Sequence, residues 1–125
     1  MAYVYILKCS DGSYYTGSTT DVERRAVEHA MKLPTGAKYT RARDVVEVSC
    51  VWSAPTLSSA AKLEYYIKKR LSHAKKQELI GSPHLLFEYI STELHENGYS
   101  YSHRISEKEL QKLIEKHEQK KKTKQ

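Results

Sequence analysis

The feature that most constrains the fold is a β-hairpin pattern at the start of the chain. Residues 2–8 are mostly β-branched and aromatic, residues 10–12 read Ser-Asp-Gly, and residues 13–18 are again typical of a strand. The valine-rich residues 45–52 predict a third strand. The first part of the chain is therefore expected to form a small antiparallel sheet.

Loop length decides which side chains of this hairpin share a face. A two-residue Asp-Gly turn would put Tyr5 and Tyr15 on opposite faces of the sheet. A three-residue loop with Gly12 in the left-handed conformation would instead pair Tyr5 with Gly17, and both tyrosines would then lie on one face. We expect the three-residue loop.

Several later segments have the periodicity of helices. Residues 20–23 read Thr-Asp-Val-Glu, a capping box that predicts the start of a helix ending before Pro34. A second helix is expected over residues 58–71, followed by a short basic helix. Residues 84–97 and 106–119 predict two further helices.

These elements predict an α+β fold, with a small three-stranded antiparallel sheet flanked by helices and a helical C-terminal extension. The length of 125 residues suits a single modest core. The expected division is a catalytic-type domain over residues 1–82, a helical extension over residues 83–119 and a disordered basic tail over residues 120–125.

The charge of the chain favours a nucleic-acid partner, but only weakly. The net charge is +6 and the pI about 9.2. Lysines of residues 120–125 supply four of these charges, so residues 1–119 carry only +2. A lysine-rich tail is also a common solubilising end, so charge alone does not identify a partner.

The remaining composition excludes several classes of protein. No apolar run approaches the ~18 residues of a membrane span, and the N-terminus lacks the layout of a signal peptide, so we expect a cytoplasmic protein without a membrane partner. Cys9 and Cys50 are too few for a disulfide scaffold or a zinc site and are expected to be buried free thiols.

Glu64 falls among the apolar positions of the second predicted helix. A carboxylate at such a place loses hydration unless it is paired or bound to a metal. Two interpretations follow: a buried partner of Arg25 or of a lysine, or a ligand for magnesium or manganese. The apolar positions around it are Ala60, Leu63, Ile67 and Leu71.

Arg25 and His29 are four residues apart and project from one side of the first predicted helix. Taken alone, the arginine suits an ion pair or a phosphate, and the histidine suits a core position. The chain has ten tyrosines and one phenylalanine. These tyrosines can pack with their hydroxyls at the surface, or some of the hydroxyls can take part in a reaction. Together these groups suit a reaction at phosphate, because arginine neutralises developing charge while tyrosine or histidine moves a proton.

A basic segment over residues 36–43 reads Gly-Ala-Lys-Tyr-Thr-Arg-Ala-Arg. Such a loop can contact phosphates and stack on a base, or it can be a solvated surface loop. The run over residues 68–70 can extend this basic surface or form an exposed helix face. The candidate nucleic-acid-binding residues are Lys38, Tyr39, Arg41, Arg43 and Lys68.

The order of these motifs resembles the GIY-YIG nuclease superfamily, particularly its small single-domain bacterial branch. The resemblance covers about residues 2–80. The departures are Tyr3 in place of a glycine and Thr16 in place of an isoleucine, and neither removes a proposed chemical group. The motifs are Tyr3-Val4-Tyr5, Tyr15-Thr16-Gly17, residues 23–29, the Gly-Ala-Lys-Tyr-Thr-Arg segment and Glu64.

The resemblance implies a role for each residue of the hairpin motifs. Tyr15 would act as general base on the attacking water. Tyr5 would orient that water or share its proton. Gly17 would keep the floor of the site open where a side chain would obstruct the substrate.

It also implies roles for the helical residues. Arg25 would stabilise the transition state at phosphate, and His29 would assist. Glu64 would bind one divalent metal, Mg²⁺ or Mn²⁺. The expected function is therefore a metal-dependent endonuclease acting on DNA.

Two other classes of function stay open. The chain could be a nucleic-acid-binding module without catalytic turnover, or an interaction adaptor working through residues 84–125.

Overall fold

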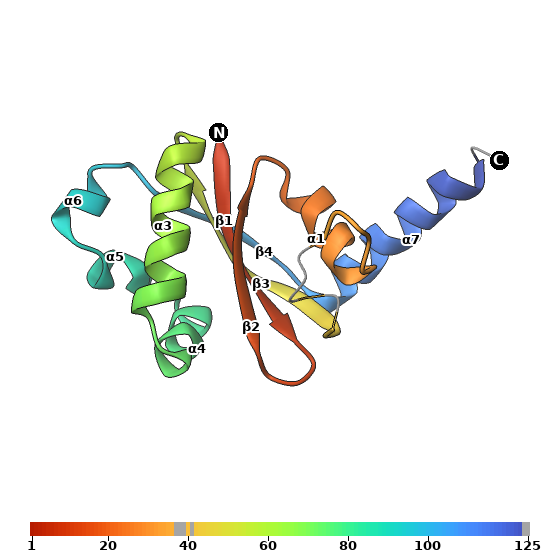
Figure 1. The fold of residues 1–125 in the computed structure, drawn as a ribbon, viewed down its shortest axis with the longest axis horizontal. Coiled ribbons are helices and arrows are strands. Elements are labelled where there is room, and N and C mark those ends of the chain that lie inside the picture. The colour runs from red at the N-terminus through yellow and green to blue at the C-terminus, as the bar shows by residue number, and fades with distance from the viewer. Residues whose placement is uncertain (37–39, 41, 124–125) are drawn as a thin grey trace.

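The computed structural model describes residues 1–36, 40 and 42–123 of the chain. Its centre is a four-stranded antiparallel sheet with the strand order β2-β1-β3-β4 (Figure 1). The strands are β1 (Ala2–Cys9), β2 (Tyr14–Thr19), β3 (Val45–Ala54) and β4 (Ser100–Ile105).

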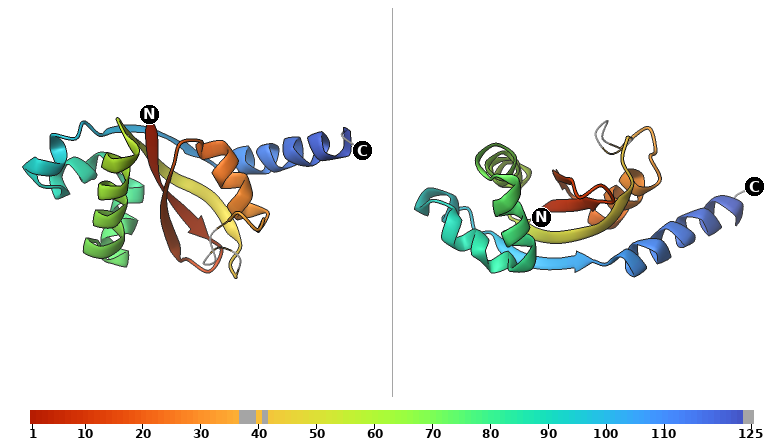
Figure 2. Two further views of the ribbon diagram at one scale, coloured as in Figure 1. Left: turned by 45° about the horizontal axis from the view of Figure 1, so that its top comes forward. Right: turned by 90° about the horizontal axis from the view of Figure 1, so that it is seen from below.

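Helices lie on both sides of this sheet. Figure 1 shows α3 and α4 on one side and α1 and α7 on the other, and both figures show α7 projecting from the rest of the molecule (Figures 1 and 2). The helices are α1 (Val22–Ala30), α3 (Leu57–Arg70), α4 (His73–Gly81), the 3-10 turn η1 (Pro83–Leu85), α5 (Leu86–Tyr89), α6 (Thr92–His95) and α7 (Glu107–Thr123).

Two apolar clusters fill the space on the two faces of the sheet. Alternate residues of a strand point to opposite faces, so Val4 and Ile6 pack on the α3 side while Leu7 packs on the α1 side. The first cluster includes Trp52 and Leu63, and the second joins α1 to α7. Burial on both faces fixes the pairing register of the sheet.

The hairpin has the expected three-residue loop. Gly12 has φ +84°, and the Cys9 amide donates a hydrogen bond to the Ser13 carbonyl at 2.9 Å. Tyr5 is paired with Gly17, two positions from the pairing of Leu7 with Tyr15. Tyr5 and Tyr15 therefore lie on the same face, as the loop length predicted.

The expectation of three strands is corrected by β4, which pairs with β3. Four of its six residues are exposed and only Ile105 is buried, so its sequence lacks the apolar alternation of a strand. The predicted helix over residues 84–97 is also wrong, because Ile90 is extended and divides the segment into short turns. The α+β class with an antiparallel sheet flanked by helices is confirmed.

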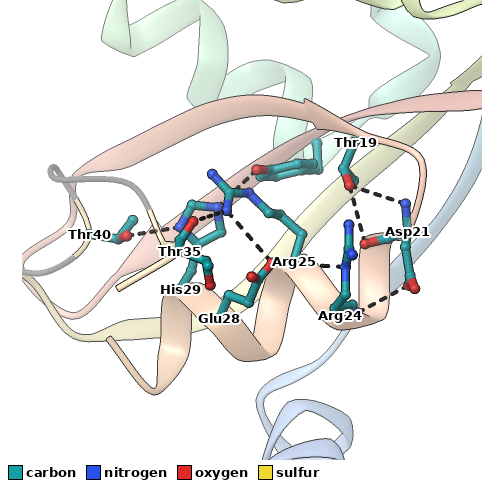
Figure 3. A network of polar contacts seen from close by, with 9 residues as sticks. Thr19, Asp21, Arg24, Arg25, Glu28, His29, Thr35 and Thr40 are labelled. Atoms are coloured by element: carbon teal, nitrogen blue, oxygen red, sulfur yellow. Dashed lines mark hydrogen bonds and ion pairs between the residues drawn. The ribbon is translucent and has the colours of Figure 1, made fainter. Parts of the chain in front are cut away.

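Helix starts differ from the sequence pattern by about one residue. The N-cap of α1 is Asp21, whose carboxylate accepts a hydrogen bond from the Arg24 amide at 3.1 Å, rather than Thr20 (Figure 3). The N-cap of α3 is Thr56, which forms a capping box with Ser59.

The C-terminal segment contributes to the same sheet and core as the rest of the chain. β4 adds a strand beside β3, and α7 continues to Thr123, into the segment expected to be a disordered tail. Residues 124–125 lie outside the described residues. The division of the chain after residue 82 stays a prediction.

Two further expectations concern the thiols and the membrane. Cys9 and Cys50 are free and buried, as predicted. Within the described ranges, no helix has both the length and the apolar character required to cross a membrane.

Candidate active site

The two hairpin tyrosines lie together over Gly17. The ring centroids of Tyr5 and Tyr15 are 6.5 Å apart. A Cβ atom added to Gly17 would lie 2.4 Å from Tyr5 Oη and 2.6 Å from Tyr5 Cζ. Glycine is therefore required here to seat the Tyr5 phenol, whereas its role in admitting substrate stays a prediction.

The Tyr5 hydroxyl belongs to a chain of buried polar groups. Tyr5 Oη lies 2.9 Å from His29 Nε2, and His29 Nδ1 lies 2.8 Å from Thr40 Oγ1. Figure 3 shows the His29 ring on α1 turned toward Thr40. A neutral imidazole satisfies all three groups when Tyr5 donates to Nε2 and the Nδ1 hydrogen is donated to Thr40.

Burial keeps these groups uncharged. It lowers the pKa of His29 from 6.5 to about 4, and the positive charge of Arg25 acts in the same direction while Glu28 opposes it. Burial raises the pKa of the Tyr5 phenol, and a hydrogen bond with Arg25 opposes part of that rise. Near neutral pH the pair is therefore a phenol whose hydroxyl donates a hydrogen bond to a neutral imidazole.

Arg25 is held next to this pair by α1 and by the segment that follows it. Its guanidinium donates to the Thr35 carbonyl, and Nη1 lies 3.6 Å from Glu28 Oε1 (Figure 3). The side chain is 24% exposed, so part of the guanidinium can still reach a ligand. Its carboxylate partner is Glu28, so the pairing of Arg25 with Glu64, one of the alternatives left open, is not observed.

Glu64 projects from α3 toward the edge strand β2. Its Oε1 accepts a hydrogen bond from Ser18 Oγ at 2.5 Å, and its Oε2 lies 3.1 Å from Lys68 Nζ. The side chain is 24% exposed, so the carboxylate lies beside the apolar stripe and not inside it. Pairing with a lysine was one of the two interpretations of this position.

The groups from α1 and α3 meet around the edge strand. The Tyr15 ring centroid lies 5.2 Å from that of His29 and 5.0 Å from Lys68 Nζ. The charges of Arg25 and Glu64 both act on the Tyr5 phenol. The catalytic candidates therefore form one cluster on both sides of β2, comprising Tyr5, Tyr15, Arg25, His29 and Glu64.

The donor set at Glu64 suits a weakly held, hydrated metal ion. Among the residues that the structure describes, no group of three or more His, Cys, Asp or Glu could enclose a metal. Mg²⁺ commonly keeps several waters and binds through one or two carboxylates together with substrate phosphates. One half-buried carboxylate at the edge of the cluster fits that mode of binding, although Lys68 now contacts it.

The nucleic-acid-binding candidates are only partly visible. Lys38, Tyr39 and Arg41 lie outside the described residues. Arg43 Nε lies 3.4 Å from Asp11 Oδ2 at the hairpin loop. Lys68 lies among these catalytic candidates, against Glu64 and Tyr15.

Sequence reasoning did not identify two partners in the cluster, Ser18 and Thr40. Ser18 contacts a residue 46 positions away, and Thr40 contacts one 11 positions away. No sequence pattern predicts such long-range contacts for a serine or a threonine. The one available signal was general: a buried histidine and a half-buried glutamate require polar partners.

A family model described as the GIY-YIG catalytic domain matches residues 1–78. The UPF0213 protein BH0048 of Halalkalibacterium halodurans is 48% identical over 79 residues, covering 63% of this chain and 81% of that protein. A UPF0213 protein of Halobacterium salinarum is 49% identical over 79 residues, covering 63% of this chain and 99% of that protein. The solution NMR structure of UPF0213 protein BH0048 from Bacillus halodurans matches with 43% identity and a TM-score of 0.38, covering 74% of this chain and 99% of that chain.

Proposed function

The chain belongs to the GIY-YIG catalytic domain family, a nuclease superfamily, and from this premise we propose that it is a divalent-metal-dependent endonuclease hydrolysing phosphodiester bonds in DNA. The observation that carries the proposal is the single cluster around β2. It combines a tyrosine–histidine hydrogen bond, a partly exposed arginine and a half-buried carboxylate. Hydrolysis at phosphate requires groups of these kinds to transfer protons and neutralise charge.

Proton transfer is assigned to the two tyrosines and the histidine. Tyr15 is half-buried and acts as general base on the attacking water, as the family resemblance implies. Its ring lies 5.2 Å from the neutral His29 imidazole, which assists by holding the Tyr5 hydroxyl through a hydrogen bond. Tyr5 is only 2% exposed and orients the water or shares its proton, with its hydroxyl held by His29.

Charge stabilisation is assigned to Arg25 and Glu64. The exposed part of the Arg25 guanidinium neutralises charge that develops on the phosphoryl oxygens. Glu64 holds one divalent metal, Mg²⁺ or Mn²⁺. A metal bound there supplies Lewis-acid stabilisation of the scissile phosphate and of the leaving oxygen.

Binding of the DNA strand is assigned to the cations around the cluster. Arg43 lies at the hairpin loop and Lys68 lies beside Tyr15. At these places both side chains can contact phosphates. Lys38, Tyr39 and Arg41 are proposed to contribute to the same binding because of their sequence motif. Phosphate contacts of this kind give affinity without sequence preference.

The test is a cleavage assay with a panel of nucleic acids. The full chain is incubated with plasmid, single-stranded, branched and RNA substrates in Mg²⁺ or Mn²⁺, beside Glu64→Gln and the exposed control Glu96→Gln. Metal-dependent cleavage that Glu64→Gln loses and Glu96→Gln keeps supports the proposal. Binding without cleavage of any substrate favours a non-catalytic module, and cleavage unchanged in Glu64→Gln overturns the metal assignment.

A further inference from the structure

Lys68 lies at the carboxylate to which the metal is assigned. Its Nζ is 3.1 Å from Glu64 Oε2 and 5.0 Å from the Tyr15 ring centroid. The other oxygen of that carboxylate accepts the Ser18 hydroxyl at 2.5 Å. In this structure, both oxygens of Glu64 are therefore engaged by the protein itself.

An ammonium and a divalent metal compete for such a carboxylate. Two positive charges within a few ångströms repel each other, and the repulsion is largest where water is partly excluded. Lys68 is one helical turn from Glu64, has a flexible four-carbon stem and is 36% exposed along its side chain. It can therefore leave the carboxylate without any change in the backbone of α3.

We propose that Lys68 is a resident counter-cation of this site. Its ammonium holds Glu64 and lies against Tyr15 while no metal is bound, and a divalent metal binds Glu64 by displacing it. The proposal rests on the assigned metal role of Glu64. After displacement, the Lys68 ammonium stays beside Tyr15. There it can contact the phosphate of the proposed DNA substrate.

The experiment measures binding of Mn²⁺ alone to the full chain by electron paramagnetic resonance. The variants are Lys68→Met, Lys68→Arg and Lys69→Met, the last being the matched control at an exposed lysine of the same helix. Loss of a partly exposed ion pair predicts about two- to fivefold tighter Mn²⁺ binding in Lys68→Met. Lys68→Arg and Lys69→Met should bind Mn²⁺ as the wild type does.

Glu64→Gln separates failure of this proposal from failure of the proposed function. Weaker Mn²⁺ binding in Glu64→Gln, with unchanged, weaker or undetectable binding in Lys68→Met, overturns the competition and leaves the metal role intact. Equal binding in Glu64→Gln and wild type overturns the metal role and the competition together. Urea unfolding of Lys68→Met and of a second variant, Lys68→Gln, establishes that both are folded.

Discussion

Three buried polar groups, Tyr5, His29 and Thr40, satisfy one another between β1 and α1. Each would lose free energy if it were buried alone, because it would give up its hydrogen bonds to water. The contacts therefore fix the His29 ring, and burial keeps it neutral beside the phenol whose hydrogen bond it accepts. The arrangement couples the stability of the fold to the chemistry proposed for the site.

The lowered pKa of His29 predicts a pH dependence of stability. The folded protein takes up this proton near pH 4, whereas the unfolded chain takes it up near pH 6.5. The free energy of unfolding contributed by this group is therefore fully present above pH 6.5 and decreases as the pH falls to 4, by at most about 3 kcal/mol. Urea unfolding of metal-free protein across this range measures the slope. A His29→Gln variant that keeps the full slope would contradict the assignment.

Gly17→Ala is predicted to displace the Tyr5 phenol. The added Cβ would lie 2.4 Å from Tyr5 Oη, so the ring must move or the strands must separate. We expect a loss of about 1–3 kcal/mol in the free energy of unfolding and a loss of DNA cleavage of about 10²-fold. Urea unfolding and a cleavage assay measure the two effects.

Gly81→Ala is the matched control for that substitution, because a Cβ at Gly81 meets nothing within 4 Å. It should leave both measurements close to wild type. Normal cleavage by Gly17→Ala would show that the position of the Tyr5 ring does not matter to the reaction.

At the scale of single residues, the sequence indicates which polar side chains lie at apolar positions better than it predicts their partners. Glu64 stood out because a carboxylate beside apolar positions needs a partner, but its lysine and serine contacts depend on how α3 approaches β2. His29 was expected at a core position, where it is fully buried, but its contacts with Tyr5 and Thr40 could not be predicted from its spacing. These pairings arise from tertiary packing, which the spacing along one helix does not encode.

The hairpin is the element whose geometry the sequence predicts most completely. Its loop length and the two-residue period of strands together determine that Tyr5 and Tyr15 share a face, and the observed register agrees. β4 was missed because an edge strand with one buried side needs few apolar residues. The helices before it were misjudged because Ile90 adopts an extended conformation within an apparently helical pattern.

Gly12→Ala tests the backbone requirement of the hairpin loop. Gly12 has φ +84°, and nothing lies within 4 Å of an added Cβ, so the cost is conformational and not steric. We expect a loss of about 1–2 kcal/mol in the free energy of unfolding. Gly12→Asn should cost less, because asparagine tolerates the left-handed conformation better. Urea unfolding that gives equal losses for both variants would contradict this explanation.

The chain extends beyond residues 1–78, which match the family model. Its C-terminal third supplies one strand of the sheet. The Halobacterium salinarum relative aligns over 99% of its length with only 63% of this chain, so it has almost nothing to match the remainder. In this chain that remainder supplies β4 beside β3, and α7 packs against α1, which carries Arg25 and His29. We infer that the extension stabilises the domain that carries the site.

Truncation after residue 82 is predicted to destabilise the protein strongly. It removes Leu86, Leu110 and other buried side chains from both apolar clusters, so a loss of about 3 kcal/mol or more is expected. Trp52, the single tryptophan, is fully buried and paired with Tyr101 of β4, so its fluorescence should shift to the red. A truncated chain with wild-type tryptophan emission and an unchanged urea midpoint would show that residues 1–82 form an independent domain.

The central claim is that the cluster around β2 hydrolyses DNA with a metal bound at Glu64. Its most direct test is the single-turnover rate of cleavage of a labelled DNA substrate in Mg²⁺ or Mn²⁺, for the wild type and for Glu64→Gln. We expect metal-dependent cleavage by the wild type and a decrease of about 10²-fold or more in Glu64→Gln. Equal rates for the two proteins, or no cleavage by a folded wild type that still binds DNA, would contradict it.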